Sequence, residues 1–115
     1  CVLEKIAKLI SSKVYRIDSK QREIIHVSAV FANNFSNHMF SIADEICESN
    51  QIPFNILHPL INETVKKLSD LAPKEAQTGP AVRNDQETIK KHLLLLPDKY
   101  QLIYKRLTES IQNEH

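Results

Sequence analysis

Glycine is the residue that this sequence most nearly lacks, with Gly79 as the only one among 115 residues. The GxGxxG dinucleotide-binding loop and the Walker phosphate-binding loop each need several glycines, because their backbone closely approaches the phosphates. The sequence therefore excludes both loops. Any nucleotide that the protein uses must be held mainly by residues outside this chain.

Cysteine, excess charge and long apolar runs are also scarce. Cys1 and Cys47 form no CxxC pair and no disulfide framework, which is typical of a reducing compartment, so we expect a cytoplasmic protein. The net charge is only +1, from 15 basic and 14 acidic residues mixed along the chain, so we expect no nucleic-acid partner. We also expect no membrane segment, because no apolar run approaches the about 20 residues that cross a bilayer. The first residue is not Met, which indicates a piece of a longer protein.

The composition suits one small domain, since 42% of the 115 residues are hydrophobic. Apolar spacing over residues 1–12 predicts a short amphipathic helix, and β-branched and aromatic residues over 13–18 predict one strand. A single strand is not stable alone, so we expect it to pair with a sheet outside this chain or with a second copy.

The longest predicted element is a helix that begins at Asp18. Asp18 and Gln21 have the spacing of a capping box, and no glycine or proline follows before Pro53. Apolar residues lie on nearly every side of its first half, so we expect that half to be buried as a central helix. The second half is amphipathic.

Three further helices are expected after Pro53. Apolar spacing marks them over residues 56–68, 89–96 and 100–111, and we expect Pro59 to kink the first of them. Pro97 ends the second, and a loop over residues 75–85 precedes it. The predicted fold class is all-α, with about five helices and one strand.

Two groups of polar residues are candidates for chemistry. At about 100° per residue, His26, Asn33 and Asn37 share a narrow strip of the long helix, with Asn34 and His38 beside it. If buried, such groups either form internal hydrogen bonds or line a wet cleft, because an unpaired one costs about 1–3 kcal/mol. Both interpretations stay open, and the clustering favours a cleft.

The second group is the loop from Thr78 to Asp85. Asn84 tolerates a left-handed backbone, Asp85 or Asn84 can cap the next helix, and the guanidinium of Arg83 can bind a carboxylate or phosphate. Alternatively, Arg83 pairs with Asp85 and the loop is a rigid turn. The spacing of the five histidines predicts no metal site, and no nucleophile elbow is present.

Three segments resemble a known family in their order and spacing. They are REIIHVSAVFANNFSNHM, LHPLINET and TGPAVRNDQETIKKHLLLL. Together they are similar to the helical C-terminal domain, a domain of unknown function, of Rossmann-like NADP-dependent oxidoreductases. The resemblance runs from about Arg22 to Leu96. Asn84 stands where the family usually has glycine, which is a mild departure because asparagine also adopts left-handed conformations.

The resemblance implies a fold and an activity. The family is similar to pyrroline-carboxylate reductases and 6-phosphogluconate dehydrogenases, so it implies a multi-helical bundle around a long central helix. Residues 1–18 would be the tail of a missing dinucleotide-binding domain with its strand, and residues 19–115 a substrate-side and dimerisation domain. The whole protein would transfer a hydride between NADP(H), held mainly by its own Rossmann domain, and a small carbonyl or imine substrate. The chain alone would be inactive.

The resemblance also implies the site. His26 and Asn34 would be catalytic, and five residues near the next helix would bind substrate: Thr78, Gly79, Pro80, Arg83 and Asp85. The alternative is a non-catalytic helical interaction and dimerisation module. In both cases we expect a homodimer.

Overall fold

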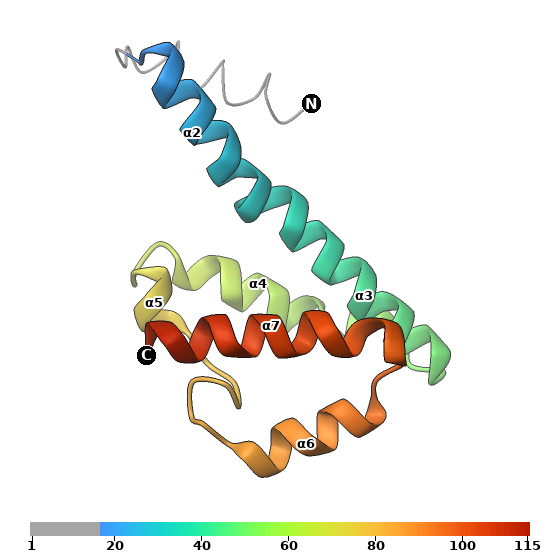
Figure 1. Cartoon of the computed structure of the whole chain (residues 1–115). Helices are drawn as coiled ribbons and strands as arrows, with labels where there is room; N and C mark the ends of the chain where they lie inside the picture. The colour runs from blue at the N-terminus through green and yellow to red at the C-terminus, as the bar shows by residue number, and fades with distance from the viewer. Residues whose placement is uncertain (1–16) are drawn as a thin grey trace. The chain divides into compact units, whose positions relative to one another are not determined.

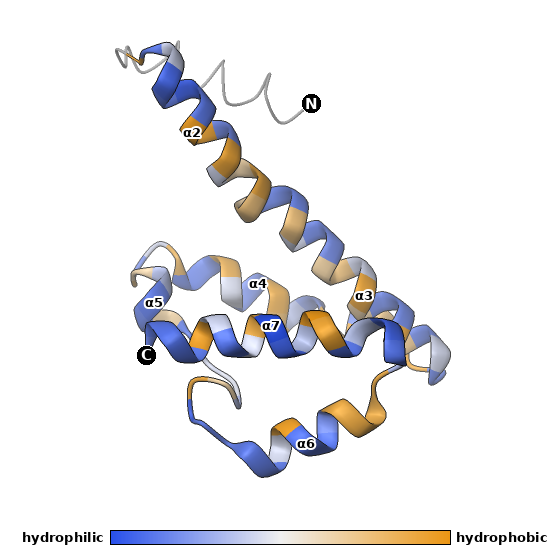
Figure 2. Ribbon diagram, in the orientation of Figure 1, coloured by the Kyte–Doolittle hydropathy of each residue, from blue (hydrophilic) through white to orange (hydrophobic). Residues whose placement is uncertain are grey.

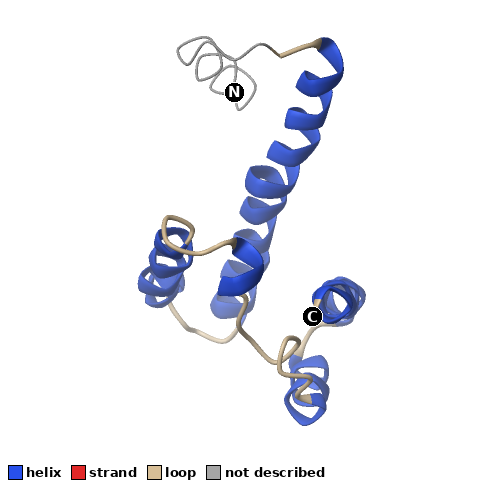
Figure 3. Cartoon of the chain, turned by 90° about the vertical axis from the view of Figure 1, so that its left-hand side faces the viewer, coloured by secondary structure: helices blue, strands red, loops and turns tan. Residues whose placement is uncertain are grey.

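The structure, a computed structural model, describes residues 17–115, and every regular element within them is helical (Figure 3). The predicted all-α class is confirmed for this part of the chain. The predicted helix over residues 1–12 lies outside the described residues, as does the predicted strand except for Ile17 and Asp18, which are not in a strand. The chain divides into two units, Cys1–Pro53 and Phe54–His115.

The first unit is built on one long run of helix (Figure 1). Its successive parts are α2 (Ser19–Ala29), the π-helix η1 (Val30–Phe35) and α3 (Ser36–Ser49). The predicted capping box is confirmed: the Gln21 backbone N–H donates to Asp18 Oδ1 at 2.7 Å, and the Asp18 N–H donates to Gln21 Oε1 at 3.0 Å. These two bonds satisfy two donors that a helix start otherwise leaves free.

The first half of this helix is exposed, which corrects the prediction that it is buried on all sides. Ile24, Val27 and Phe31 are 54%, 56% and 64% exposed, and α2, η1 and α3 contain no buried residue. The prediction was wrong because burial of such a helix needs covering elements, and no other described helix belongs to this unit. Elements other than the described helices of this unit must therefore cover its apolar side chains if they are to be buried.

The second unit holds the remaining helices. They are η2 (Phe54–Leu57, a 3₁₀-helix), α4 (His58–Lys67), α5 (Pro73–Ala76), α6 (Gln86–Leu95) and α7 (Asp98–Glu114). The predicted kink at Pro59 is wrong, because α4 only begins at His58. Pro59 thus lies in the first turn, where its missing N–H is not needed. The backbone leaves the helical conformation at Leu96, the residue before Pro97, as predicted.

Buried side chains are few in the described chain. Ala81 and Ile89, both in the second unit, are the buried hydrophobic residues among residues 17–115, each 8% exposed. Leu94 and Leu95, near the end of α6, are 87% and 82% exposed. A helical domain is normally stabilised by burying its apolar faces. The exposed apolar side chains of the described helices are therefore available to contact other chains or domains. None of the described helices combines the length and the apolar character that crossing a membrane requires.

Candidate functional site

The five candidate polar residues of the long helix are all exposed. His26 lies in α2, Asn33 and Asn34 lie in η1, and Asn37 and His38 lie in α3. None of these five side chains forms a hydrogen bond, an ion pair or a ring contact with another described residue. Internal hydrogen bonding was one of the two interpretations of the sequence, and within residues 17–115 it does not occupy these side chains. No described residue competes with a ligand for their donors and acceptors.

The π-helix changes which of these residues share a face. Its backbone bonds span five residues instead of four, so it takes up one extra residue and turns the helix beyond it back by about 100°. In an uninterrupted α-helix, Asn37 would lie about 20° from His26, and His38 about 120° from it. After the rotation, His38 lies about 20° from His26, while Asn37 lies about 80° away on the other side.

Asn34 lies on the same face of the helix as His26 and His38. As the fifth residue of η1, it has undergone most of this rotation and lies about 10° from His26. The sequence-based strip of His26, Asn33 and Asn37 is therefore corrected to His26, Asn34 and His38, which we call the polar face. The prediction failed because it assumed about 100° for every residue.

An apolar stripe runs beside the polar face. By the same arithmetic, its members lie about 60–120° around the helix from His26. They are Val27, Phe31, Phe35, Met39, Ile42 and Ile46. Within the stripe, the Phe31 and Phe35 rings meet edge to face at 5.0 Å between centroids. Figure 2 shows hydrophobic segments interrupting the hydrophilic ones along α2, η1 and α3.

The loop before α6 has a fixed backbone. Gly79 has a φ of +107°, and Asn84 has the left-handed φ of 53° that was predicted to be tolerated there. The Asp85 N–H donates to the Pro80 carbonyl oxygen at 2.9 Å, and the Asn84 N–H donates to that of Ala81 at 3.1 Å. No atom lies within 4 Å of a Cβ built on Gly79, so the backbone angle rather than crowding favours glycine there.

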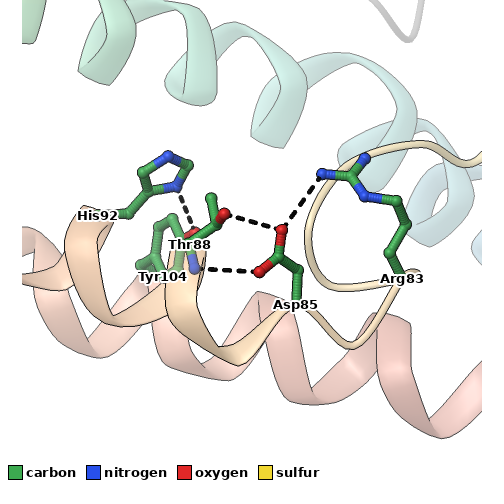
Figure 4. A network of polar contacts seen from close by, with 5 residues as sticks. All are labelled: Arg83, Asp85, Thr88, His92 and Tyr104. Carbon is green, nitrogen blue, oxygen red and sulfur yellow. Dashed lines mark hydrogen bonds and ion pairs between the residues drawn. The ribbon is translucent and has the colours of Figure 1, made fainter.

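Asp85 caps α6, as predicted (Figure 4). It accepts hydrogen bonds from the Thr88 backbone N–H at 3.1 Å and from Thr88 Oγ1 at 2.8 Å. These bonds, with a smaller contribution from the charge of Arg83, lower the pKa of Asp85 below its ordinary value. The oxygens of Asp85 are thus engaged by the helix start.

Arg83 pairs with Asp85, its Nη2 lying 3.8 Å from Asp85 Oδ2. The Arg83 side chain is 60% exposed, and an exposed pair at this distance is weak. Arg83 therefore keeps most of its donors available for an anionic group, so the pair and ligand binding are compatible.

Thr78 lines a hollow in the second unit, whereas Gly79 and Pro80 do not. The hollow has a volume of about 240 Å³, and Thr64 and Lys67 of α4 line it together with Ala76 of α5. The residues predicted to bind substrate therefore share one loop, with Thr78 at one end and Arg83 and Asp85 at the other.

A contact that was not predicted joins α6 to α7. His92 Nδ1 lies 2.7 Å from the Tyr104 hydroxyl, and Gln101 Nε2 donates to the Leu93 carbonyl oxygen at 2.9 Å. The pair is drawn in Figure 4, and burial raises the pKa of the Tyr104 hydroxyl above its ordinary value. The sequence carried one signal for this contact, since a tyrosine in the apolar stripe of a helix needs a partner for its hydroxyl.

Comparison with known proteins identifies the family. A model of the family described as a domain of unknown function, DUF2520, matches residues 1–111, so the chain belongs to this family. The crystal structure of a "putative NADP oxidoreductase" from Bacteroides fragilis is similar over 86% of this chain, with 44% sequence identity and a TM-score of 0.83. The matched region is 39% of that protein. A search of curated proteins gives no match. The resemblance found in the sequence is confirmed.

Proposed function

We propose that this chain is the helical C-terminal domain of an NADP-dependent oxidoreductase, in which it closes the cofactor cleft and mediates dimerisation. The observation that carries this proposal is the polar face, a row of imidazole and amide groups without partners in the described chain. The similarity to the Bacteroides fragilis protein over part of that protein supports it.

The residues of this chain suit the nicotinamide end of NADP but not its diphosphate. Its single glycine leaves no loop for the diphosphate, so another domain must hold that part. The exposed donors of the polar face suit the carboxamide of the nicotinamide end and a substrate beside it. When bound, NADPH supplies the hydride, and this chain supplies hydrogen bonds and excludes water.

In this proposal, His26 and Asn34 face the nicotinamide cleft as hydrogen-bond donors, and His26 donates to the charge that develops on a carbonyl or imine substrate. Thr78, Gly79 and Pro80 form the loop that approaches the substrate. Arg83 binds an acidic group of the substrate through its exposed guanidinium. Asp85 is a positioning residue, because it fixes the loop to the start of α6.

The apolar stripe is the proposed dimer contact. Phe31 and Phe35 are 64% and 48% exposed, which costs free energy unless another surface covers them. A second copy of the same helix would offer a matching stripe, as a two-fold interface requires.

The test uses the full-length protein with its upstream domain. Calorimetry with NADPH and NADH should show binding, and reductase activity should fall in His26→Ala and Arg83→Ala. Normal turnover in both variants would remove the site assignment. If the full-length protein dimerises but binds neither nucleotide, the alternative holds, in which the chain is a non-catalytic interaction and dimerisation module. The exposure of the apolar stripe is the observation in favour of that alternative.

A further inference from the structure

His38 is absent from the site proposed above, yet the π-helix brings it, together with Asn34, to the face of His26. The two residues are four positions apart, so they lie about 6 Å apart along the helix axis and can reach one ligand group. His26 lies about 12 Å from Asn34 along the axis and must meet a different part of the ligand.

The hydrogen-bonding capacities of this pair match a carboxamide. The Asn34 side chain has both a donor and an acceptor, so it can pair with an amide that offers the complementary two. The His38 ring can add one N–H, which suits the second lone pair of the same carbonyl oxygen. No other described residue uses either side chain.

The neighbouring apolar stripe supplies an apolar surface for the ring of such a ligand. Phe35 and Met39 lie about 70–120° around the helix from the polar face, one position beyond Asn34 and His38 respectively. A flat ring that carries a carboxamide can therefore cover apolar surface while its amide meets the polar face.

We propose that Asn34 and His38 together bind the carboxamide of the nicotinamide, with the π-helix η1 setting the register that places them beside His26. This rests on the proposed function, because it requires NADP to be the cofactor. It adds His38 as a binding residue and assigns Asn34 to the cofactor, while His26 remains for the substrate.

The experiment compares His38→Ala with Asn37→Ala in the full-length protein. Asn37 is the matched control, since it is the neighbouring exposed polar residue and would share the face of His26 only in an uninterrupted α-helix. By calorimetry, His38→Ala should weaken NADPH binding about fivefold, the equivalent of one neutral hydrogen bond. Asn37→Ala should change it less than about twofold.

A second readout monitors the imidazoles directly. In the ¹⁵N-labelled protein, addition of NADP⁺ should shift the ring nitrogen signals of His38 more than those of His26 and His58. Circular dichroism of both alanine variants should show unchanged helix content, which separates lost contacts from lost structure.

The outcomes are distinguishable. Weakening by Asn37→Ala that equals or exceeds that by His38→Ala, or a His38 signal that stays fixed at saturating NADP⁺, would overturn the proposal while leaving the oxidoreductase function intact. If wild-type protein binds no NADPH, the proposed function fails and this inference fails with it.

Discussion

Deleting Ala32 tests the register on which the polar face depends. Ala32 is an exposed residue of η1, and the π-helix holds one residue more than an α-helix needs for the same turns. Removing one residue should therefore convert η1 to α-helix and leave α2 and α3 in their present alignment. His38 would remain about 20° from His26.

The expected change in the free energy of unfolding is small, because the deletion leaves the apolar stripe intact. No apolar side chain leaves the stripe, and bonds spanning five residues give way to regular α-helical ones. We expect the free energy of unfolding to change by less than about 1 kcal/mol, which is about 4 °C in Tm for a domain of this size. NADPH binding by the full-length protein should be retained.

The matched control is the deletion of Ala43, which lies in regular α-helix. There the loss of one residue has no bulge to absorb it, so Ile46 turns by about 100° away from the stripe. In the proposed dimer, where the stripe is covered, moving one isoleucine out of contact costs about 2 kcal/mol, or about 8 °C in Tm. Differential scanning calorimetry of both variants makes the comparison. Equal destabilisation by the two deletions, or loss of NADPH binding in the Ala32 deletion, would refute the alignment of α2 with α3 described above.

Three further predictions address the helix contacts, the stripe and the cap. Tyr104→Phe removes the hydroxyl that lies 2.7 Å from His92 and should lower Tm by about 4 °C, the equivalent of about 1 kcal/mol; an unchanged Tm would mean that the contact contributes nothing. Phe31→Glu should convert the proposed dimer to monomer in analytical ultracentrifugation, whereas Ala32→Glu, which lies about 100° from the stripe, should not; a dimeric Phe31→Glu protein would exclude the stripe as the interface. Because the folded-state pKa of Asp85 is lowered, its stabilising effect is present above the ordinary aspartate pKa and is lost as pH falls towards the folded value. Urea unfolding of Asp85→Asn should therefore depend less on acid than that of the wild type, and identical pH profiles would contradict the cap.

Local signals in the sequence predicted the ends of the helices well. The capping box at Asp18, the cap at Asp85 and the stop before Pro97 depend on residues within four positions of each other, and each is confirmed. Asn84 likewise has the left-handed backbone that its side chain tolerates. These features could be predicted because their energies are local and hardly depend on how the helices pack.

The features that were missed depend on longer-range or cooperative effects. A π-helix replaces several backbone hydrogen bonds of an α-helix at once, and no single residue in Val30–Phe35 is a sequence signal for it. The residues predicted to share a face with Asn34 were therefore the wrong ones. The burial expected for Ile24 failed for a different reason. Apolar residues on all sides of a helix indicate that it is covered, but not whether the cover belongs to the same chain.

Both wrong predictions concern the helix from Ser19 to Ser49, and the geometry of that helix links them. A helix that must present apolar residues to one partner and polar residues to another needs two faces that stay apart over its whole length. With about 100° per residue, spacings of four drift by about 40° each time, so Val27 and Met39 would diverge by about 120° in an uninterrupted α-helix. The one-residue excess in η1 removes most of that drift. The π-helix thus keeps the apolar stripe straight and the polar face continuous beside it, which a regular helix with this sequence would not do.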